Sequence, residues 1–402
     1  FGWFAVRWQL GNMLAELTLP TDPGAKDIAA LAVQLSPGDP MANWLSVGTR
    51  KNVFTPEGVA ATAKSYEQIA GLSPNDYRWW VEVGRAREQA EEIAAAEQAF
   101  LRAVEIAPSY TYPRWQLGNF YLRQNRSEEA FAQLKKAAES YTVYREQVFS
   151  VAWDYYEKDT ARLEELAGNA PSVRAGLAKF YASKERAADS LRVWNTLSAE
   201  EKVANAPIAK VIAQSFYEKR FFRQAQDFIR ELEIEPEARF ETIQNAGFEN
   251  PFGNSQEIYF GWNVVPTEKI EIKFDPTQKR EGRRSLRVSF NGYAEPTLYN
   301  IYQYVTVQPT ANYRLTFLMR TENLKSGGTP AVEIYNANDD KNIITSAAFP
   351  TGTNDWQPVK LEFTAPVNAE AVGIRTVRAF CGAECPIIGV IWYDDFKLEK
   401  IK

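Results

Sequence analysis

The stretch YRWWVEVGRAREQAEEIAAAEQAFLRAVEIAP, residues 77–108, decides the fold of the first half of the chain. Its apolar residues recur three and four positions apart, as on the buried face of an amphipathic helix. Two such runs flank a short polar segment around residue 90. The stretch therefore predicts two helices joined by a tight turn and ended by Pro108.

Related stretches recur along residues 1–235. The hexapeptide RWQLGN occurs at Arg7–Asn12 and again at Arg114–Asn119. The spacing resembles the tetratricopeptide repeat, with W-x2-L-G-x2-Y in its first helix and A-x3-F in its second. The best copy departs from the pattern at Arg87, where the family has tyrosine. Its matching positions are Trp80, Val83, Gly84, Ala96, Phe100, Ala103 and Pro108.

Further copies extend the resemblance in both directions. Earlier copies end at Pro37 and Pro74, and the stretch 143–200 is helical in character but off the pattern. The next copy uses Leu117, Gly118, Tyr121, Ala130, Leu134 and Ala137, and a weaker last copy uses Ala213, Phe216, Ala225, Ile229 and Leu232. The resemblance implies an all-α solenoid over residues 1–235 that binds a protein partner or another copy of itself.

The composition changes near residue 236. Val, Ile, Thr, Tyr and Phe then alternate with polar residues between Gly, Asn and Pro turns. This pattern predicts an antiparallel β-sandwich, or jelly roll, over residues 240–402. The expected strands are 258–264, 269–274, 285–290, 298–307, 312–320, 331–336, 343–348, 357–364, 371–379 and 389–399.

The second half resembles a carbohydrate-binding module of the jelly-roll type. The matching segments are Asn245-Ala-Gly-Phe-Glu249, Gly261-Trp262, Gly282-Arg-Arg-Ser-Leu, Tyr313-Arg-Leu-Thr-Phe and Trp392-Tyr-Asp-Asp-Phe. The resemblance implies the fold and a possible polysaccharide partner. The same sandwich also serves as a structural or protein-binding module, so sugar binding does not follow from the fold.

Alternation along two strands separates a core face from a candidate glycan face. Tyr313, Leu315, Phe317 and Met319 should be core, and so should Tyr299, Ile301, Val305 and Val307. Rings interleaved with amide and guanidinium groups suit stacking and hydrogen bonding to sugars. The alternative is that the tyrosines pack against the helical domain or a neighbouring strand. The candidate glycan residues are Asn300, Tyr302, Tyr304, Arg314 and Arg320.

Two further groups of residues suggest sites. The resemblance nominates Glu249 with Asp394 or Asp395 for a structural calcium ion, which needs several oxygen ligands at one point. The alternative is hydrogen bonding at strand ends. Cys381 and Cys385, the two cysteines of the chain, are expected to form a local disulfide, or else to remain reduced thiols.

The composition of the 402-residue chain argues against several classes of function. A net charge of −5 disfavours nucleic acid as a partner. The absence of histidine removes imidazole bases and histidine-ligated metals. No P-loop or dinucleotide fingerprint occurs, and the paired glutamates on helices diverge around the helix. We therefore expect no catalytic residue, no required cofactor and no enzyme activity.

The sequence begins at Phe1 and contains no run of eighteen apolar residues. Trp3, Phe4 and Trp8 are either the packed face of a first helix or the remnant of a membrane anchor upstream of Phe1. A disulfide would favour an extracytoplasmic location, in the cell envelope, at the surface or outside the cell. The leading hypothesis is a non-catalytic scaffold or adaptor. The alternative is a self-assembling structural subunit of a filament, sheath or surface layer.

Overall fold

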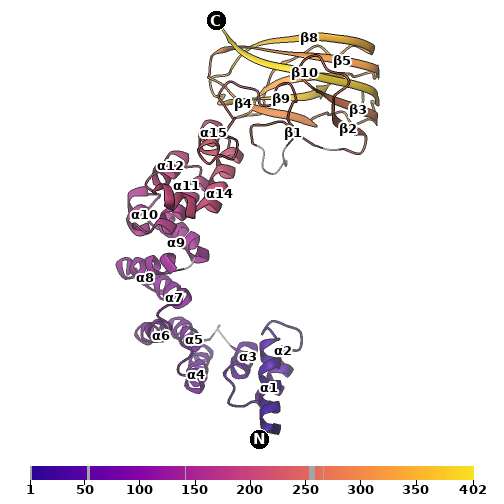
Figure 1. Ribbon diagram of the computed structural model, residues 1–402. Helices are drawn as coiled ribbons and strands as arrows, with labels where there is room; N and C mark the ends of the chain where they lie inside the picture. The colour runs from indigo at the N-terminus through magenta and orange to yellow at the C-terminus, as the bar shows by residue number, and fades with distance from the viewer. Residues whose placement is uncertain (1, 52–54, 141, 253–258, 266) are drawn as a thin grey trace. The chain divides into compact units, whose positions relative to one another are not determined.

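The computed structural model describes residues 2–51, 55–140, 142–252, 259–265 and 267–402. In this described part of the chain, helices occupy the sequence up to Glu231 and strands begin at Asn263 (Figure 1). The multidomain α and β class expected from the sequence is confirmed: a helical N-terminal region is followed by an antiparallel β-sandwich. Phe1 and position 258, the start of the first expected strand, lie outside the described residues.

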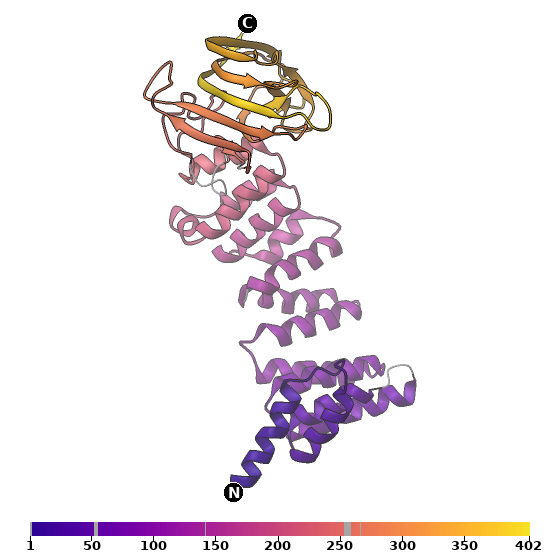
Figure 2. The same ribbon diagram turned by 90° about the vertical axis from the view of Figure 1, so that its right-hand side faces the viewer.

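The helices form antiparallel pairs (Figure 2). Their bounds are α1 Gly2–Glu16, α2 Ala25–Leu35, α3 Pro40–Arg50, α4 Pro56–Leu72, α5 Tyr77–Gln89, α6 Ile93–Ile106, α7 Thr111–Arg123, α8 Ser127–Ser140, α9 Thr142–Tyr155, α10 Thr160–Ala167, α11 Pro171–Ser183, α12 Ala187–Trp194, α13 Ala199–Ala204, α14 Ala206–Glu218 and α15 Phe222–Glu231.

Local sequence explains where several of these helices begin. The Asp39 carboxylate accepts a hydrogen bond from the Ala42 amide at the start of α3, and Thr55 caps α4 in the same way. A proline follows each cap at the first helical position, where its missing N–H costs nothing. Asp76 and Asp159 cap α5 and α10. These turns therefore fix where each new helix begins.

Small residues set the approach of the two helices in a pair. A Cβ at Gly84 would lie 2.8 Å from the Phe100 ring, and one at Gly118 would lie 2.8 Å from the Leu134 side chain. The glycines of the repeat pattern are therefore required for packing. Tyr121, one of the positions of the repeat pattern, is 5% exposed. Its hydroxyl donates to Glu97 at 2.9 Å, which links α7 to the preceding pair.

The chain divides into two compact units. Unit 1 comprises residues 1–180 with 193–201, and unit 2 comprises residues 181–192 with 202–402. Helices α14 and α15 thus belong with the β-sandwich, although their sequence belongs to the helical repeats. The change in secondary structure near residue 236 does not coincide with the division into compact units.

The strands of unit 2 form two antiparallel sheets. Sheet A has the order β1-β4-β9-β6-β7, and sheet B has the order β2-β3-β10-β5-β8. The bounds are β1 Asn263–Val264, β2 Ile270–Asp275, β3 Ser285–Tyr293, β4 Ile301–Thr306, β5 Asn312–Lys325, β6 Pro330–Asn336, β7 Asn342–Thr345, β8 Gly352–Thr364, β9 Ala371–Arg378 and β10 Ile387–Ile401.

The sandwich core lies between the two sheets. Tyr313, Leu315, Phe317 and Met319 of β5 are each at most 3% exposed, so the alternation expected for this strand is confirmed. Phe317 stacks on Phe396 of β10 with ring centroids 4.6 Å apart. The buried residues of both sheets form one continuous apolar core between them.

Candidate functional site

The candidate glycan residues on strands lie in two different sheets of the sandwich. Tyr302 and Tyr304 belong to β4 in sheet A, whereas Arg314 and Arg320 belong to β5 in sheet B. The expectation of one shared face is therefore wrong. The alternation rule gives the side of a strand on which a residue lies, but it does not say which sheet the strand joins.

The two arginines are paired within sheet B. Arg314 forms an ion pair with Glu362 of β8 at 2.8 Å. Arg320 approaches Asp355 of the same strand at 3.3 Å, and its guanidinium carbon lies 5.6 Å from the centroid of the Trp392 ring. These contacts are cross-strand pairs of an ordinary solvated sheet face.

The burial of Asn300 and Tyr299 is the reverse of what the sequence predicted. Asn300 is 4% exposed, and neither atom of its side-chain amide has a hydrogen-bond partner. Tyr299, expected in the core, is 48% exposed. The physical reason is that β4 begins at Ile301, so both residues belong to the preceding loop, where strand alternation does not hold.

Tyr304 packs against helices of the same unit. Its ring lies 5.2 Å from Phe222 of α15 and 5.7 Å from Tyr217 of α14. Burial, together with the nearby Tyr304, raises the pKa of Tyr217 well above its usual range. Tyr304 is therefore a packing residue, which was the alternative interpretation of this face.

Polar contacts secure the helices to sheet A around these rings. The buried hydroxyl of Thr306 donates to Gln226 of α15 at 2.7 Å. Arg223 of the same helix donates from Nη2 to the carbonyl of Val307 at 2.8 Å. The Arg220 guanidinium forms an ion pair with Asp340 at 2.6 Å. These bonds cover the outer face of sheet A at the Tyr304 end of β4.

A cluster of polar and aromatic residues occupies sheet A next to the covered region. Arg375 of β9 lies between two rings, with its guanidinium carbon 4.2 Å from the centroid of Tyr299 and 4.0 Å from that of Tyr335. Its Nε–H donates to Glu333 of β6. Tyr302 of β4 lies directly opposite Arg375 in the sheet register. We call Tyr299, Tyr302, Glu333, Tyr335 and Arg375 the Arg375 cluster.

The neighbouring glycine of β9 makes this cluster possible. Gly373 lies opposite Tyr335 in the register, and a Cβ at Gly373 would come within 2.2 Å of the Tyr335 ring. The ring can therefore lie flat across β9 and reach the guanidinium. Burial and the neighbouring Tyr304 raise the pKa of the Tyr335 hydroxyl, and at 3% exposure this ring forms the buried side of the cluster.

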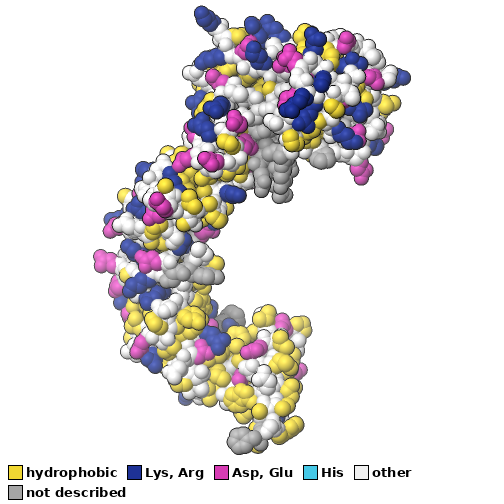
Figure 3. All heavy atoms as spheres, viewed as in Figure 1, with side chains coloured by type: hydrophobic (Ala, Val, Ile, Leu, Met, Phe, Trp, Pro, Cys, Tyr) yellow, Lys and Arg dark blue, Asp and Glu magenta, His cyan; other side chains and the backbone are white. Residues whose placement is uncertain are grey.

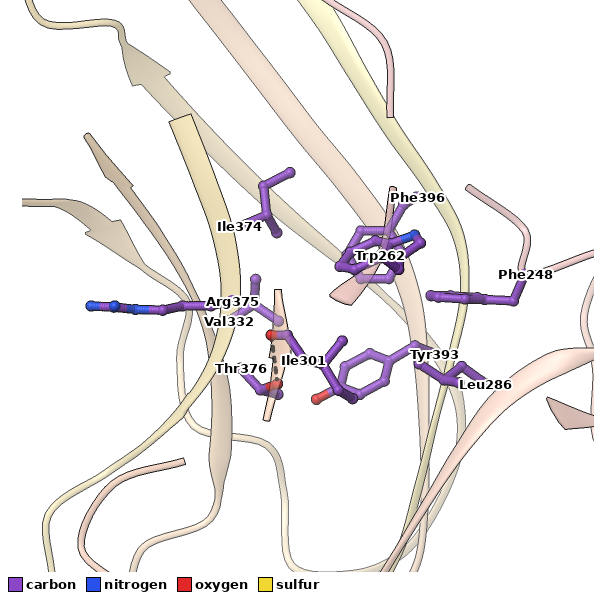
Figure 4. Close-up of a pocket in the computed structure, with 10 residues that line it drawn as sticks. All are labelled: Phe248, Trp262, Leu286, Ile301, Val332, Ile374, Arg375, Thr376, Tyr393 and Phe396. Carbon is purple, nitrogen blue, oxygen red and sulfur yellow. Dashed lines mark hydrogen bonds between the residues drawn. The ribbon is translucent and has the colours of Figure 1, made fainter. Parts of the chain in front are cut away.

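Between the two sheets, the described residues enclose a cavity that is too small for a sugar. The cavity between the sheets has a volume of about 10 Å³ and is lined by Phe248, Trp262, Tyr393 and their neighbours (Figure 4). That volume is close to the minimum for one water molecule. Arg375 borders the cavity through its stem, and its guanidinium points away from it (Figure 4). This cavity is therefore not the place where a sugar could bind.

The carboxylates nominated for calcium meet at one loop. Glu249 Oε1 accepts from the Arg283 amide at 2.8 Å, and Asp394 Oδ2 accepts from the Arg280 amide at 2.9 Å. Gly282 has a φ of +60° and passes so close to Glu249 that a Cβ would lie 2.0 Å from Oε1. The structure thus brings Glu249 and Asp394 to the same turn, whereas Asp395 is exposed.

The two carboxylates differ in their protonation behaviour. Backbone hydrogen bonds from Arg283 and Arg284 lower the pKa of Glu249, whereas burial raises the pKa of Asp394. Within the described ranges, no three Asp, Glu or Cys side chains gather in a way that would hold a metal. Backbone amides engage both groups in the structure, and calcium stays a prediction.

Cys381 and Cys385 are joined by a disulfide in the structure, with their Cα atoms 5.8 Å apart. The bond lies in the loop between β9 and β10. Arg378, 9% exposed, holds the same loop by donating to the carbonyls of Cys385 and Gly328. The loop is therefore fixed by one covalent bond and by a buried guanidinium.

Unit 1 contains a separate groove. It has a volume of about 530 Å³ and is lined by residues of α4, α5 and α7, among them Tyr66, Glu82, Arg85 and Arg123. Burial raises the pKa of Glu82, while Arg123 is paired with Glu88 at 2.7 Å. The repeat pattern did not single out these polar residues, because it is defined by the small and apolar positions that pack.

Comparison with known proteins gives different matches for different parts of the chain. Residues 241–377 match the family described as Carbohydrate binding domain. No curated protein matches the chain. A solved structure described as "CBM4 structure and function" is 16% identical, with a TM-score of 0.30, and the match covers 40% of this chain and 100% of that one. The CBM22-1 xylan-binding domain from Paenibacillus barcinonensis Xyn10C is 14% identical over 39% of this chain and 92% of that one, with a TM-score of 0.27.

A different protein matches at a comparable level. MamA from Desulfovibrio magneticus RS-1, from residue 41 to its end, is 19% identical with a TM-score of 0.27, and the match covers 34% of this chain and 74% of that one. No helix in the described part of the chain is both long enough and apolar enough to cross a bilayer. The chain thus carries a sandwich that matches a carbohydrate-binding family over residues 241–377, and a helical region before it.

Proposed function

We propose that the chain is a non-catalytic extracytoplasmic adaptor whose sandwich binds a polysaccharide at the Arg375 cluster and whose helical repeats bind a protein. The observation that carries the proposal is the stacking of the Arg375 guanidinium between Tyr299 and Tyr335 on sheet A. Aromatic faces stack on the CH groups of a pyranose, and phenol and guanidinium donors bond to its hydroxyl groups.

The cluster is organised before any ligand binds. The ion pair with Glu333 and the two rings hold Arg375 in one orientation, so little side-chain entropy is lost on binding. Tyr299 presents an accessible ring, since 48% of its surface is exposed. Tyr302 is half-buried beside it and extends the aromatic surface along β4. A short stretch of glycan fits such an arrangement.

The contents of the cluster favour binding over catalysis. Glycoside hydrolysis ordinarily uses two carboxyl groups placed on either side of the scissile bond. The Arg375 cluster contains one carboxylate, Glu333, and that group is committed to the ion pair with Arg375. The Cys381–Cys385 disulfide supports a location outside the reducing cytoplasm.

The groove of unit 1 supports the protein-binding half of the proposal. Its volume of about 530 Å³ and its mixture of charged and aromatic side chains suit an extended peptide segment. Helical repeats of this kind present such surfaces without chemistry of their own.

The direct test is affinity electrophoresis of the full chain in gels containing neutral and acidic polysaccharides, chosen from a glycan array. Tyr299→Ala should weaken binding by about fivefold to 150-fold, as expected for one stacked ring at roughly 1–3 kcal/mol. Phe380→Ala is the matched control, because Phe380 is 81% exposed and lies outside the cluster. If Tyr299→Ala binds glycan as the wild type does, the Arg375 cluster is not the binding site. A folded wild-type chain that binds no glycan would refute the sugar-binding role.

A further inference from the structure

Arg378 of β9 places a positive charge inside unit 2 with no carboxylate paired to it. The residue is 9% exposed. Its guanidinium donates to three carbonyls, those of Glu295, Gly328 and Cys385. In the described part of the chain, no Asp or Glu side chain forms an ion pair with it. Burial lowers the pKa of Arg378, because carbonyl oxygens compensate a buried charge less well than an anion does.

Other arginines of the sandwich have carboxylate partners. Arg314 pairs with Glu362 at 2.8 Å, and Arg375 pairs with Glu333. On the face shown in Figure 3, basic and acidic side chains lie interspersed over the sandwich. Keeping a cation buried without an anion is costly. An anionic group that formed beside Arg378 would therefore be stabilised.

The disulfide between Cys381 and Cys385 lies against the same guanidinium. Nη2 of Arg378 is 3.7 Å from Sγ of Cys381. Nη2 also donates to the hydroxyl of Ser326 at 3.2 Å, and that hydroxyl lies 3.6 Å from Sγ of Cys385. Each sulfur atom of the bond thus has a hydrogen-bond donor beside it, a guanidinium for Cys381 and a hydroxyl for Cys385.

Two glycines allow the polar groups to approach the disulfide. A Cβ at Gly328 would lie 2.9 Å from Sγ of Cys381, and one at Gly327 would lie 3.3 Å from the Cβ of the same cysteine. The segment before β6 therefore packs directly on the disulfide. From the other direction, the amide of Cys385 donates to the carbonyl of Ala294 at 3.2 Å. The backbone thus holds both sulfur atoms close to their donors.

Reduction of the disulfide would provide the anion that Arg378 lacks. A thiolate beside Arg or Lys is stabilised, and the pKa of its thiol falls below the ordinary value of about 8.5. A thiol of lower pKa is also a faster leaving group in exchange. We infer that Cys381–Cys385 is a thiol–disulfide exchange site, at which a dithiol delivers two electrons and Arg378 keeps the sulfur of Cys381 as a thiolate. This reactivity is independent of glycan binding.

The exposure of the two sulfur-bearing residues sets the order of the steps. Cys381 is half-buried, whereas Cys385 is 4% exposed. A thiolate of the dithiol attacks Sγ of Cys381, the S–S bond breaks, and Cys385 leaves as a thiolate beside the hydroxyl of Ser326. The second thiolate of the dithiol then attacks the dithiol sulfur of the mixed disulfide, and Cys381 leaves as a thiolate beside Arg378.

The overall exchange balances. The dithiol loses two electrons and becomes a disulfide, and the protein gains these two electrons in place of its S–S bond. Of the two protons that the dithiol gives up, one is taken by the sulfur of Cys385 and the other stays in solvent. Cys381 needs no proton, because the guanidinium of Arg378 compensates its charge.

The other titratable groups on the described segments around the loop are Tyr293, Glu295, Lys325 and Glu384. Burial raises the pKa of Tyr293, so this phenol is neutral at physiological pH. The two glutamates and the lysine are exposed, and solvent and salt screen their charges. The buried guanidinium is therefore the group that most affects the ionisation of Cys381.

Equilibration of the full chain with mixtures of reduced and oxidised dithiothreitol tests the inference, with free thiols counted by alkylation and intact mass. Arg378→Gln should need at least about a tenfold higher ratio of reduced to oxidised dithiothreitol for half-reduction, because the thiolate loses its counter-ion. Lys325→Gln is the matched control. It removes an exposed cation that lies opposite Ile388, at the other end of the loop, and should leave the ratio unchanged.

A second measurement reads the thiolate directly. Cys385→Ser leaves Cys381 as a single thiol, and the pH dependence of its alkylation by iodoacetamide gives its pKa. We expect a value at least about one unit below the ordinary 8.5, and Arg378→Gln in the same background should remove this shift. Circular dichroism checks that each variant keeps its fold.

Two results would overturn the inference. One is a folded Arg378→Gln chain that is reduced at the same dithiothreitol ratio as the wild type. The other is a Cys381 thiol that titrates at or above about 8.5 in Cys385→Ser. The second result needs no substitution of Arg378, so it decides the question even if Arg378→Gln does not fold.

Discussion

Replacing Tyr304 by alanine should loosen the attachment of α14 and α15 to sheet A. The Tyr304 ring contacts Phe222 at 5.2 Å and Tyr217 at 5.7 Å, and it lies 6.3 Å from Tyr335. Removing a fully buried aromatic side chain costs about 3–5 kcal/mol. Because Tyr304 is half-buried, we expect a loss of roughly 2 kcal/mol in the stability of this part of unit 2.

Hydrogen exchange of the full chain, followed by mass spectrometry, measures this effect where it occurs. A loss of roughly 2 kcal/mol corresponds to about a thirtyfold faster exchange in the peptides that report opening of this contact. Those peptides should cover α14, α15 and β4. Peptides from α5 to α8 in unit 1 should exchange as in the wild type, and Phe380→Ala should change neither set.

The opposite pattern would contradict the packing role. If Tyr304→Ala leaves exchange in α14, α15 and β4 unchanged while it weakens glycan binding, the ring is available to ligand and the helices do not depend on it. Tyr304→Phe separates the contributions further, because it keeps the ring contacts and removes only the hydroxyl. It should exchange nearly as the wild type does.

Four other predictions concern the rest of the chain. Gly118→Val should lower the stability of unit 1 by about 1–3 kcal/mol in thermal melts, because its Cβ would lie 2.8 Å from Leu134, whereas Gly71→Ala should be tolerated, since nothing lies within 4 Å of that Cβ. Burial alone would raise the pKa of Asp275, but hydrogen bonds from Thr277 and Trp392 lower it to about 2. Its stabilising contribution is therefore complete above the ordinary aspartate pKa and declines as pH falls toward 2, so Asp275→Asn should flatten the melting temperature over that interval. EDTA should lower the melting temperature of the sandwich and added calcium should restore it if Glu249 and Asp394 hold the ion, and an unchanged melt would leave them as partners of backbone amides alone. Reduction should add two alkylatable thiols by intact mass and destabilise the sandwich by about 2 kcal/mol, because the disulfide closes a short loop.

The strand pattern was largely predictable from the sequence because each strand alternates over a buried face. The range 371–379 anticipated β9, Ala371–Arg378, and the core side of β5 was correct at Tyr313, Leu315, Phe317 and Met319. The glycines of the repeats were also informative, since Gly84 and Gly118 stand where two helices touch. Local rules succeed where the neighbours that matter lie in the same element or the next one.

The candidate site was less predictable because its members come from strands far apart in the sequence. Arg375 contacts Tyr299, which lies in the loop before β4 where the strand alternation does not hold. It contacts Glu333 because β6 pairs with β9. No local spacing links these residues. Gly373 gave a usable signal, since an isolated glycine inside a strand often marks the close approach of another group. The contact of Tyr304 with Tyr217 had no signal of this kind.

Helix α15 is part of the repeat sequence, yet it lies in the same compact unit as the sandwich. The polar side of this helix carries Arg223 and Gln226, which bond to Val307 and Thr306 of the sandwich. Phe222 of the same helix packs on the Tyr304 ring with centroids 5.2 Å apart, and Phe228 is 1% exposed. A sandwich without this helix would present the ring of Tyr304 and the buried hydroxyl of Thr306 to water. The end of sheet A that could otherwise have extended the Arg375 cluster into a long aromatic surface therefore binds the chain's own helices. In the described part of sheet A, the region around Tyr299 and Arg375 is not covered by these helices, and it is the region that we propose binds a short segment of polysaccharide.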